Sequence, residues 1–243
     1  MPDLDQYFDE IDTARIRRAR ELSEIKRRFS TDRVPDPAGV NSKATVVLAY
    51  ANWEGFYNEC VGAYIRFLRD RGGKIRDTDW MLLLGAFHAD FESLKARSHS
   101  YDARRQFVED LQARLECGFD SFDDTIVEAR SNLNFERLVE NFSLLNIDLS
   151  SMQRFRIRLD KEVVGWRHGV AHGDPPDLSA LDIADHVDFT ANLLIVLADR
   201  FQHAMLEKSD VTACAITESL SKTHNCLLWK CISKHLQSIK SGS

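Results

Sequence analysis

The chain has 243 residues, 44% of them apolar, and carries 32 basic against 38 acidic residues, for a formal net charge of −6. This length and apolar content suit one sizeable domain with appendages and exclude wholesale disorder. The acidic balance argues against a protein that coats nucleic acid non-specifically, although it is compatible with a local basic cleft.

Cysteine spacing and hydropathy exclude three further classes of protein. The five cysteines are scattered and no Cys-x-x-Cys occurs, so neither a disulfide framework nor a zinc knuckle is indicated. The acidic start lacks the apolar core of a signal peptide, and the longest apolar run, residues 191–198, is far too short to span a bilayer. We therefore expect a protein of the reducing cytoplasm without a membrane segment.

Apolar residues recur at helical spacing nearly everywhere, and no convincing period-two alternation occurs, so the predicted fold class is all-α. Residues 4–30 predict a basic amphipathic helix, within an N-terminal segment 1–35 that packs on the core. Its arginines are usually a solvated face, with phosphate contact as the alternative. Residues 31–41 contain prolines and a glycine and predict a linker.

The remaining helices are predicted in a domain that spans residues 42–208. A long helix over about 42–70 has one apolar stripe: Val46, Tyr50, Trp53, Tyr57, Val61, Tyr64 and Leu68. Helices are also predicted over 77–95, 99–116, 134–145 and 148–172. Ser179 and Asp182 resemble a capping box that opens a last core helix ending near residue 208. Residues 209–243 form a C-terminal extension with one helix expected around 225–239.

The helix over 148–172 is expected to carry the chemistry. At ~100° per residue its apolar side chains fall on one arc, and a second stripe lies nearly opposite. That second stripe contains Arg154, Arg158, Lys161, Gly165, His168 and His172. Glycine there would let another backbone approach closely, as in a helix–helix contact. The three basic side chains are candidate contacts for phosphate groups, or alternatively solvated surface residues.

Arg167 and His172 are the candidate catalytic pair. An arginine can clamp a phosphate with two parallel hydrogen bonds, and an imidazole can transfer protons near neutral pH. The two lie ~140° apart on an ideal helix, so their convergence needs the long arginine side chain, a local distortion, or a second antiparallel copy of the helix. A surface helix with solvated arginines and a histidine cap is the alternative.

Glu54 is a candidate supporting residue, because a carboxylate within an apolar stripe needs a partner. Arg167 or another cation could be that partner. His168 and His172 also have the i, i+4 spacing of a helical zinc pair, but Gly169 replaces the glutamate of His-Glu-x-x-His and no third ligand is evident. We therefore expect neither a metal nor another cofactor.

Two segments together resemble one protein family. Arg167-His168-Gly169-Val170-Ala171-His172 looks like the Arg-polar-x(3–4)-His signature of the HEPN superfamily of helical ribonucleases, with His168 as the supporting polar residue. Residues 50–56, Tyr-Ala-Asn-Trp-Glu-Gly-Phe, resemble the first core helix of stand-alone prokaryotic HEPN toxins. The similarity covers roughly residues 42–207.

The resemblance implies an up-and-down helical bundle that dimerises through the motif helices, and metal-independent cleavage of RNA by attack of its 2′-hydroxyl. It also implies a toxin of a toxin–antitoxin or antiviral defence system, held by an inhibitor or sensor protein encoded nearby. One subgroup has a tyrosine two residues after the motif histidine, where this chain has Asp174. Regulation by nucleotide transfer to that tyrosine is therefore not expected.

Two other functions remain as alternatives to an RNA-cleaving enzyme. A catalytically idle HEPN dimer would use the basic stripe to bind RNA, nucleotide or a partner protein. A metal-dependent hydrolase would use His168 and His172 as ligands. The presence of both Arg167 and His172 favours the ribonuclease.

Overall fold

The structure is a computed structural model that describes residues 3–209, except 31–35, 37–38, 79, 98–99, 120–121, 131 and 175. Within these residues the secondary structure is helical, apart from one isolated bridge between Lys74 and Gly118. The prediction of an all-α fold is confirmed. None of the described helices has the length and hydropathy needed to cross a membrane.

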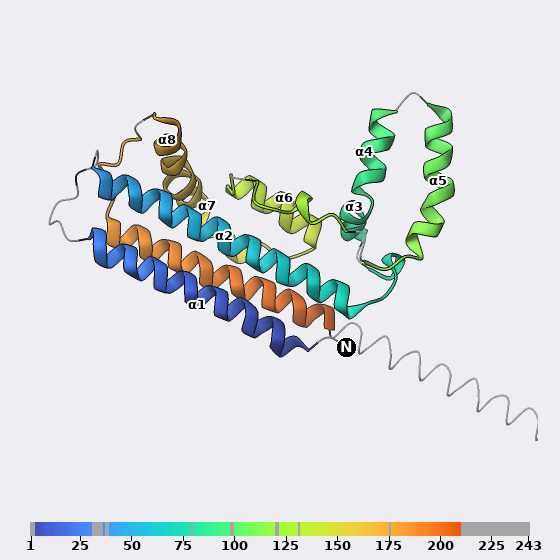
Figure 1. The fold of residues 1–243 in the computed structure, drawn as a ribbon, viewed down its shortest axis with the longest axis horizontal. Helices are drawn as coiled ribbons and strands as arrows, with labels where there is room; N and C mark the ends of the chain where they lie inside the picture. Colours follow the sequence, from blue (N-terminus) through green and yellow to red (C-terminus); the bar gives the residue numbers. More distant parts are fainter. Residues whose placement is uncertain are drawn as a thin grey trace, which may run out of the picture. The chain divides into compact units, whose positions relative to one another are not determined.

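The first two helices form an antiparallel pair. Helix α1 spans Leu4–Phe29 and begins at Asp3, whose carboxylate accepts a hydrogen bond from the Asp5 amide at 3.1 Å. Helix α2 spans Val40–Arg71 and packs along α1, as Figure 1 shows. Glu59 of α2 accepts hydrogen bonds from Arg17 at 2.5 Å and from Arg18 at 2.6 Å. These α1 arginines therefore take part in packing the helix pair.

Helix α2 is the centre of the core. All seven residues of its predicted apolar stripe are buried. Tyr57 and Tyr64 make edge-to-face contacts with Phe201 of the last helix, at centroid distances of 6.3 and 5.8 Å. Phe201 also contacts Phe142, whose helix, α6, spans Phe135–Leu145. Three helices that are far apart in the sequence therefore meet at one aromatic cluster.

The helix predicted over residues 77–95 is wrong, because this segment is broken. It consists of the short turns η1 (Ile75–Asp77), η2 (Trp80–Leu82) and α3 (Leu83–Ala86), followed by α4 (His88–Ala96). The helix is interrupted at Phe87, and Gly85 inside α3 allows the Phe122 ring to lie against its backbone, where a Cβ would come within 2.0 Å. Helix α5, Tyr101–Leu115, then packs against α4 as a hairpin, seen on the right of Figure 1.

The segment predicted as one helix over 148–172 is continuous but not regular. It begins with a 3₁₀ stretch, η5 (Ser150–Phe155), and passes through α7 (Arg156–Arg158). A π-helical stretch, η6 (Leu159–Gly165), follows, and then α8 (Trp166–His172). The constant ~100° per residue assumed from the sequence therefore does not hold before the motif.

The last helix begins at residue 183 and is described to residue 209. Its predicted capping box is wrong, because Asp182 itself accepts a hydrogen bond from the Asp185 amide at 2.9 Å. The backbone amide of Ser179 is bonded instead to Asp177. The helix expected around 225–239 lies outside the described residues, and the division at residues 35 and 208 remains a prediction.

A buried histidine lies in the core behind α8. The His186 side chain is 1% exposed and lies 5.5 Å from the Trp166 ring, measured between centroids. Neither ring nitrogen has a hydrogen-bond partner among the described residues. Burial lowers the pKa of His186 to about 4, and the nearby Arg158 adds to this effect while Asp185 opposes it. The imidazole is therefore neutral in the folded protein.

We expect folding to become less stable as the pH falls through the interval set by His186. The pKa of His186 is about 4 in the folded protein and ordinarily near 6.5. Above pH 6.5 the imidazole is neutral in both the folded and the unfolded state, so the free energy of unfolding is unaffected, and it decreases progressively as the pH falls from 6.5 toward 4. The loss between pH 7.5 and 5 should be about 2 kcal/mol in the free energy of urea unfolding. His186→Phe should abolish this pH-dependent loss of unfolding free energy, whereas substitution of the exposed His203 by Phe should leave the loss unchanged. An unchanged pH dependence in the His186 variant would contradict this assignment.

Candidate functional site

Helix α8 is held to the core by Trp166. The indole is 7% exposed and packs in a cluster with Val46 of α2 and with Leu178, Leu181 and Ile183, at and before the start of the last helix. Val170, one turn later, lies against the same cluster. Because these two side chains fix the inner face of the short helix, they also fix the directions in which Arg167, His168 and His172 point.

Arg167 covers an aromatic ring of α2. Its guanidinium carbon lies 4.4 Å from the centroid of the Tyr50 ring, a cation–π arrangement. The arginine side chain is half-buried, so the ring shields one face of the guanidinium. The contact therefore fixes the plane of the guanidinium beside the Tyr50 ring.

Tyr50 connects Arg167 with Glu54. The Tyr50 hydroxyl donates a hydrogen bond to Glu54 Oε1 at 3.1 Å and accepts one from the Leu133 amide at 3.0 Å. Burial raises the pKa of Tyr50 to about 12, and the nearby Glu54 carboxylate adds to the shift. The phenol is therefore a neutral donor at physiological pH. Half-buried Glu54 thus lies beside the ring that carries Arg167 and is linked to it through this hydroxyl.

The two histidines lie together at the exposed end of α8. The centroids of the His168 and His172 rings are 4.3 Å apart, with the ring planes inclined by 46°. Both side chains are exposed, and His172 is the last residue of the helix, followed by Gly173 in the left-handed conformation at φ 79°. Two imidazoles at van der Waals distance in solvent can bind and transfer protons without first being uncovered.

Five residues of the predicted second stripe are exposed, and Arg158 is half-buried; the exposed ones are Arg154, Lys161, Gly165, His168 and His172. Ile157, which was not part of that prediction, is exposed as well, and we call these six exposed residues the outer row. Ile157 is 81% exposed, which is unusual for a large apolar side chain on a packed helical segment.

The three basic residues predicted on the second stripe have different environments. Arg158 donates to Glu162 at 2.7 Å, pairs with Asp185, and lies 4.1 Å from the Phe189 ring centroid. Its charge is thereby already engaged in holding η6 against the last helix. Arg154 is exposed and lies over its neighbour Phe155 at 4.5 Å. Lys161 is exposed on the outer row.

Gly165 closes the π-helical stretch. A Cβ at this position would lie 3.0 Å from the carbonyl oxygen of Asp160, five residues earlier. The packing of the backbone within its own helix therefore accounts for a glycine at this position, without any approach by a second chain. A substitution at Gly165 would consequently disturb the segment that orients α8, and it cannot test dimer formation by itself.

Gly169, inside the motif, allows the loop after α8 to fold back. A Cβ there would lie 2.8 Å from the Asp174 carbonyl oxygen and 3.1 Å from the ring of Pro176. Asp174 and Pro176 thus lie against the middle of the short helix.

No group of three His, Cys, Asp or Glu side chains suited to a metal ion occurs in the described part of the chain. His168 and His172 are close to each other without a third such residue beside them.

Tyr50 is the site residue that the sequence did not single out for function. Its place in the apolar stripe is typical of a core residue, and its ring is indeed 1% exposed. The available signal was Glu54 four residues later, which places a carboxylate one helical turn from the phenol. Leu133, which binds the same hydroxyl through its backbone, has no such signal in the sequence.

Comparison with known proteins identifies the family. Residues 13–203 match the family model HEPN_RiboL-PSP, described as RiboL-PSP-HEPN, and the chain therefore belongs to this family. The match begins within α1 and ends in the last helix. No curated protein and no solved structure matches the chain at a significant level.

We expect Gly169→Ala to destabilise the protein even though alanine is the better helix former. The new Cβ would meet the Asp174 carbonyl oxygen at 2.8 Å, so the backbone at Asp174 must shift. Gly62→Ala in α2 is the matched control, because its Cβ would meet only the flexible end of Arg66, at 3.3 Å. By helix propensity the control should gain up to about 1 kcal/mol in unfolding free energy. Thermal melting that shows an equal gain for Gly169→Ala would contradict the close packing of this loop.

Proposed function

We propose that this HEPN-family protein is a metal-independent endoribonuclease and that Arg167 and His172 are its catalytic residues. The observation that carries the proposal is the arrangement of Arg167 against Tyr50, with two exposed imidazoles on the same helix, one on the next residue and one five residues further along. HEPN domains are often nucleases, which supports the same assignment.

RNA supplies its own nucleophile, so the protein needs only to position a phosphate and move two protons. A base removes the proton of the 2′-hydroxyl, the 2′-oxygen bonds to phosphorus, and the bond from phosphorus to the 5′-oxygen breaks. His172 in its protonated form gives its proton to the leaving 5′-oxygen. His168, or the His172 of a second copy, serves as the base. The products are a 2′,3′-cyclic phosphate and a 5′-hydroxyl.

Arg167 stabilises the charge that develops on the phosphate. Two parallel N–H groups match two phosphate oxygens, and the guanidinium stays charged at any physiological pH. Tyr50 holds the guanidinium plane, and Glu54 limits the motion of Tyr50 through its hydroxyl. Glu54 is therefore a positioning residue in this proposal, and it acts through the tyrosine.

The cellular role that fits such an enzyme is that of a toxin in a toxin–antitoxin or antiviral defence system, controlled by an inhibitor or sensor protein encoded nearby. Induction of the wild type in a bacterial host should arrest growth, and induction of Arg167→Ala should not. Equal, normal growth with both soluble proteins would favour an idle HEPN dimer that binds RNA, nucleotide or a protein partner.

We expect Arg167→Ala and His172→Ala each to reduce RNA cleavage by at least about a hundredfold, the usual effect of losing a proton-transfer group or an anion-stabilising donor. The measurement is cleavage of a labelled RNA in the presence of chelator, with product ends identified by mass spectrometry. Arg105→Ala on α5 is the control, because that arginine is exposed and only paired to Glu109 at 3.4 Å. Products with 5′-phosphates, or cleavage at a 2′-deoxy position, would refute the mechanism.

We also propose that the active form is a two-fold homodimer whose motif helices face each other along the outer row, since a composite cleft would bring both Arg–His pairs together. Ile157 is the apolar side chain of that row and is 81% exposed in the single chain. Ile157→Asp should give a monomer by light scattering at micromolar concentration and should lose cleavage with an unchanged melting temperature. Val108→Asp, at a 66% exposed position of α5, is the control and should remain dimeric. A wild type that is monomeric yet fully active would overturn the composite cleft.

A further inference from the structure

A polar cavity opens at the start of α6. It has a volume of about 300 Å³ and is lined by Arg130, Asn132, Asn134, Glu136, Arg137 and Glu140. A second cavity of about 440 Å³ shares Asn134 and Glu136 with it and continues to Gln153 and Arg156. None of these cavity residues takes part in the proposed proton transfers.

Leu133 connects this cavity with the Tyr50 ring on which Arg167 lies. Its amide donates to the Tyr50 hydroxyl at 3.0 Å, and its carbonyl accepts from the Trp53 indole at 3.2 Å. Asn132 and Asn134, on either side of Leu133, both line the cavity. A single residue therefore separates these amide side chains from the ring on which Arg167 lies.

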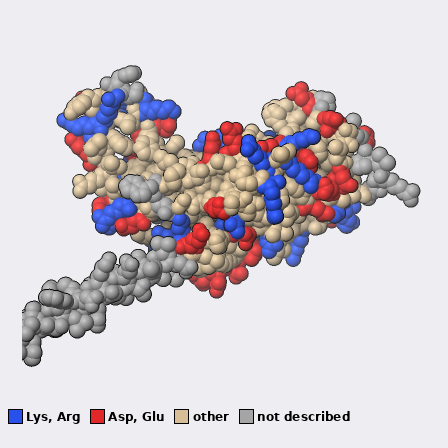
Figure 2. Space-filling model, turned by 180° about the vertical axis from the view of Figure 1, so that it is seen from behind, with Lys and Arg blue, Asp and Glu red and all other residues tan. Residues whose placement is uncertain are grey.

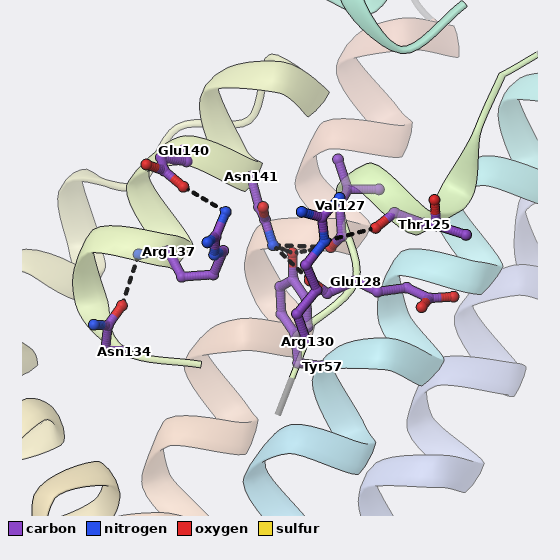
Figure 3. Close-up of polar contacts among 9 residues, drawn as sticks. All are labelled: Tyr57, Thr125, Val127, Glu128, Arg130, Asn134, Arg137, Glu140 and Asn141. Atoms are coloured by element: carbon purple, nitrogen blue, oxygen red, sulfur yellow. Dashed lines mark hydrogen bonds and ion pairs between the residues drawn. The ribbon is translucent and has the colours of Figure 1, made fainter. Parts of the chain in front are cut away.

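The turn over residues 125–130, which carries the cavity residue Arg130, is held by side-chain hydrogen bonds. Buried Asn141 donates to the carbonyl of Val127 at 2.9 Å and to the Tyr57 hydroxyl at 2.7 Å. The Arg130 Nε donates to the Thr125 carbonyl at 3.2 Å across the same turn (Figure 3). Arg130 has φ 47°, a left-handed conformation that is unfavourable for a residue other than glycine. Such strain tends to occur at ligand sites, where the surrounding structure maintains it.

The cavity chemistry fits a nucleobase better than a phosphate. Two arginines and two glutamates line it, and Arg137 is paired with Glu140 at 2.6 Å, so the charges balance. A phosphate would be repelled by the glutamates. A base edge, by contrast, needs both donors and acceptors, which amides, a guanidinium and carboxylates provide together. A base can be reached in this way only where it is unstacked, as in single-stranded RNA.

We propose that the cavity lined by Arg130, Asn132 and Asn134 holds one unpaired base of the RNA substrate next to the scissile phosphate. This inference rests on the proposed function and specifies its substrate as single-stranded RNA with a preferred base near the cut. The Asn132 and Asn134 amides contact the base edge, and the Arg130 guanidinium covers one face of the base.

The test uses His172→Ala, which binds without cleaving, and fluorescence anisotropy with labelled single-stranded oligomers of A, C and U. The parent protein should prefer one base. Arg130→Gly should weaken binding of that oligomer about tenfold, the effect of losing one stacked base contact. It should also reduce the differences in affinity among the A, C and U oligomers. Glycine relieves the backbone strain at this position, so the variant folds at least as well as its parent. Asn132→Ala, on the exposed side of the cavity, should act in the same direction.

Asn146→Gly is the matched control, because Asn146 has φ 51° at the other end of α6 and should leave binding unchanged. Unchanged affinities in both cavity variants, equal affinities for all three bases, or competition by double-stranded RNA as strong as by single strands would each overturn the base pocket. Base-selective binding that depends on Arg130, together with no cleavage by the wild type, would retain the pocket and overturn the proposed ribonuclease activity.

Discussion

The contact between Arg167 and Tyr50 is the constraint on which the candidate site depends. A cation above a buried aromatic ring gains electrostatic attraction because little water competes for it on that face. The ring itself cannot turn away, since its hydroxyl is bonded to both Glu54 and the Leu133 backbone. One tyrosine therefore orients the guanidinium, holds a carboxylate, and fixes the segment that borders the neighbouring cavity.

The helix that carries the motif is short and depends on its surroundings for its direction. A seven-residue helix is not stable alone, so Trp166 and the folded-back loop after Gly173 must hold α8 in place. The π-helical stretch before it adds residues to the turn and thereby rotates α8 relative to the preceding 3₁₀ segment. A Cβ at Gly165 or at Gly169 would meet a backbone carbonyl oxygen, at 3.0 Å and 2.8 Å respectively. The motif helix thus begins at the packed Trp166 side chain and ends with exposed imidazoles.

Long, strongly periodic elements could be predicted from the sequence, and irregular ones could not. The α2 stripe was correct because a central helix of 32 residues keeps one face buried throughout. The helix expected over 77–95 failed because its apolar spacing reveals neither the interruption at Phe87 nor the distant Phe122 ring that packs against Gly85 of the short α3. The contact between Arg167 and Tyr50 could not be predicted from the sequence for a similar reason. It depends on how α8 crosses α2, and an aromatic residue in an apolar stripe is indistinguishable from core.

Charge placement explains how an acidic chain can be suited to RNA. Figure 2 shows basic and acidic side chains interspersed over the face it presents, without one continuous basic patch. Arg17, Arg18 and Arg158 are engaged with carboxylates and serve packing. General attraction to phosphate is therefore weak, and affinity must come from local contacts. In the proposed function, the Arg167 guanidinium on Tyr50 would supply one such contact by binding a single phosphate, and the charge-balanced cavity would supply another by holding a base. Selectivity for an RNA segment would then come from local geometry and not from net charge.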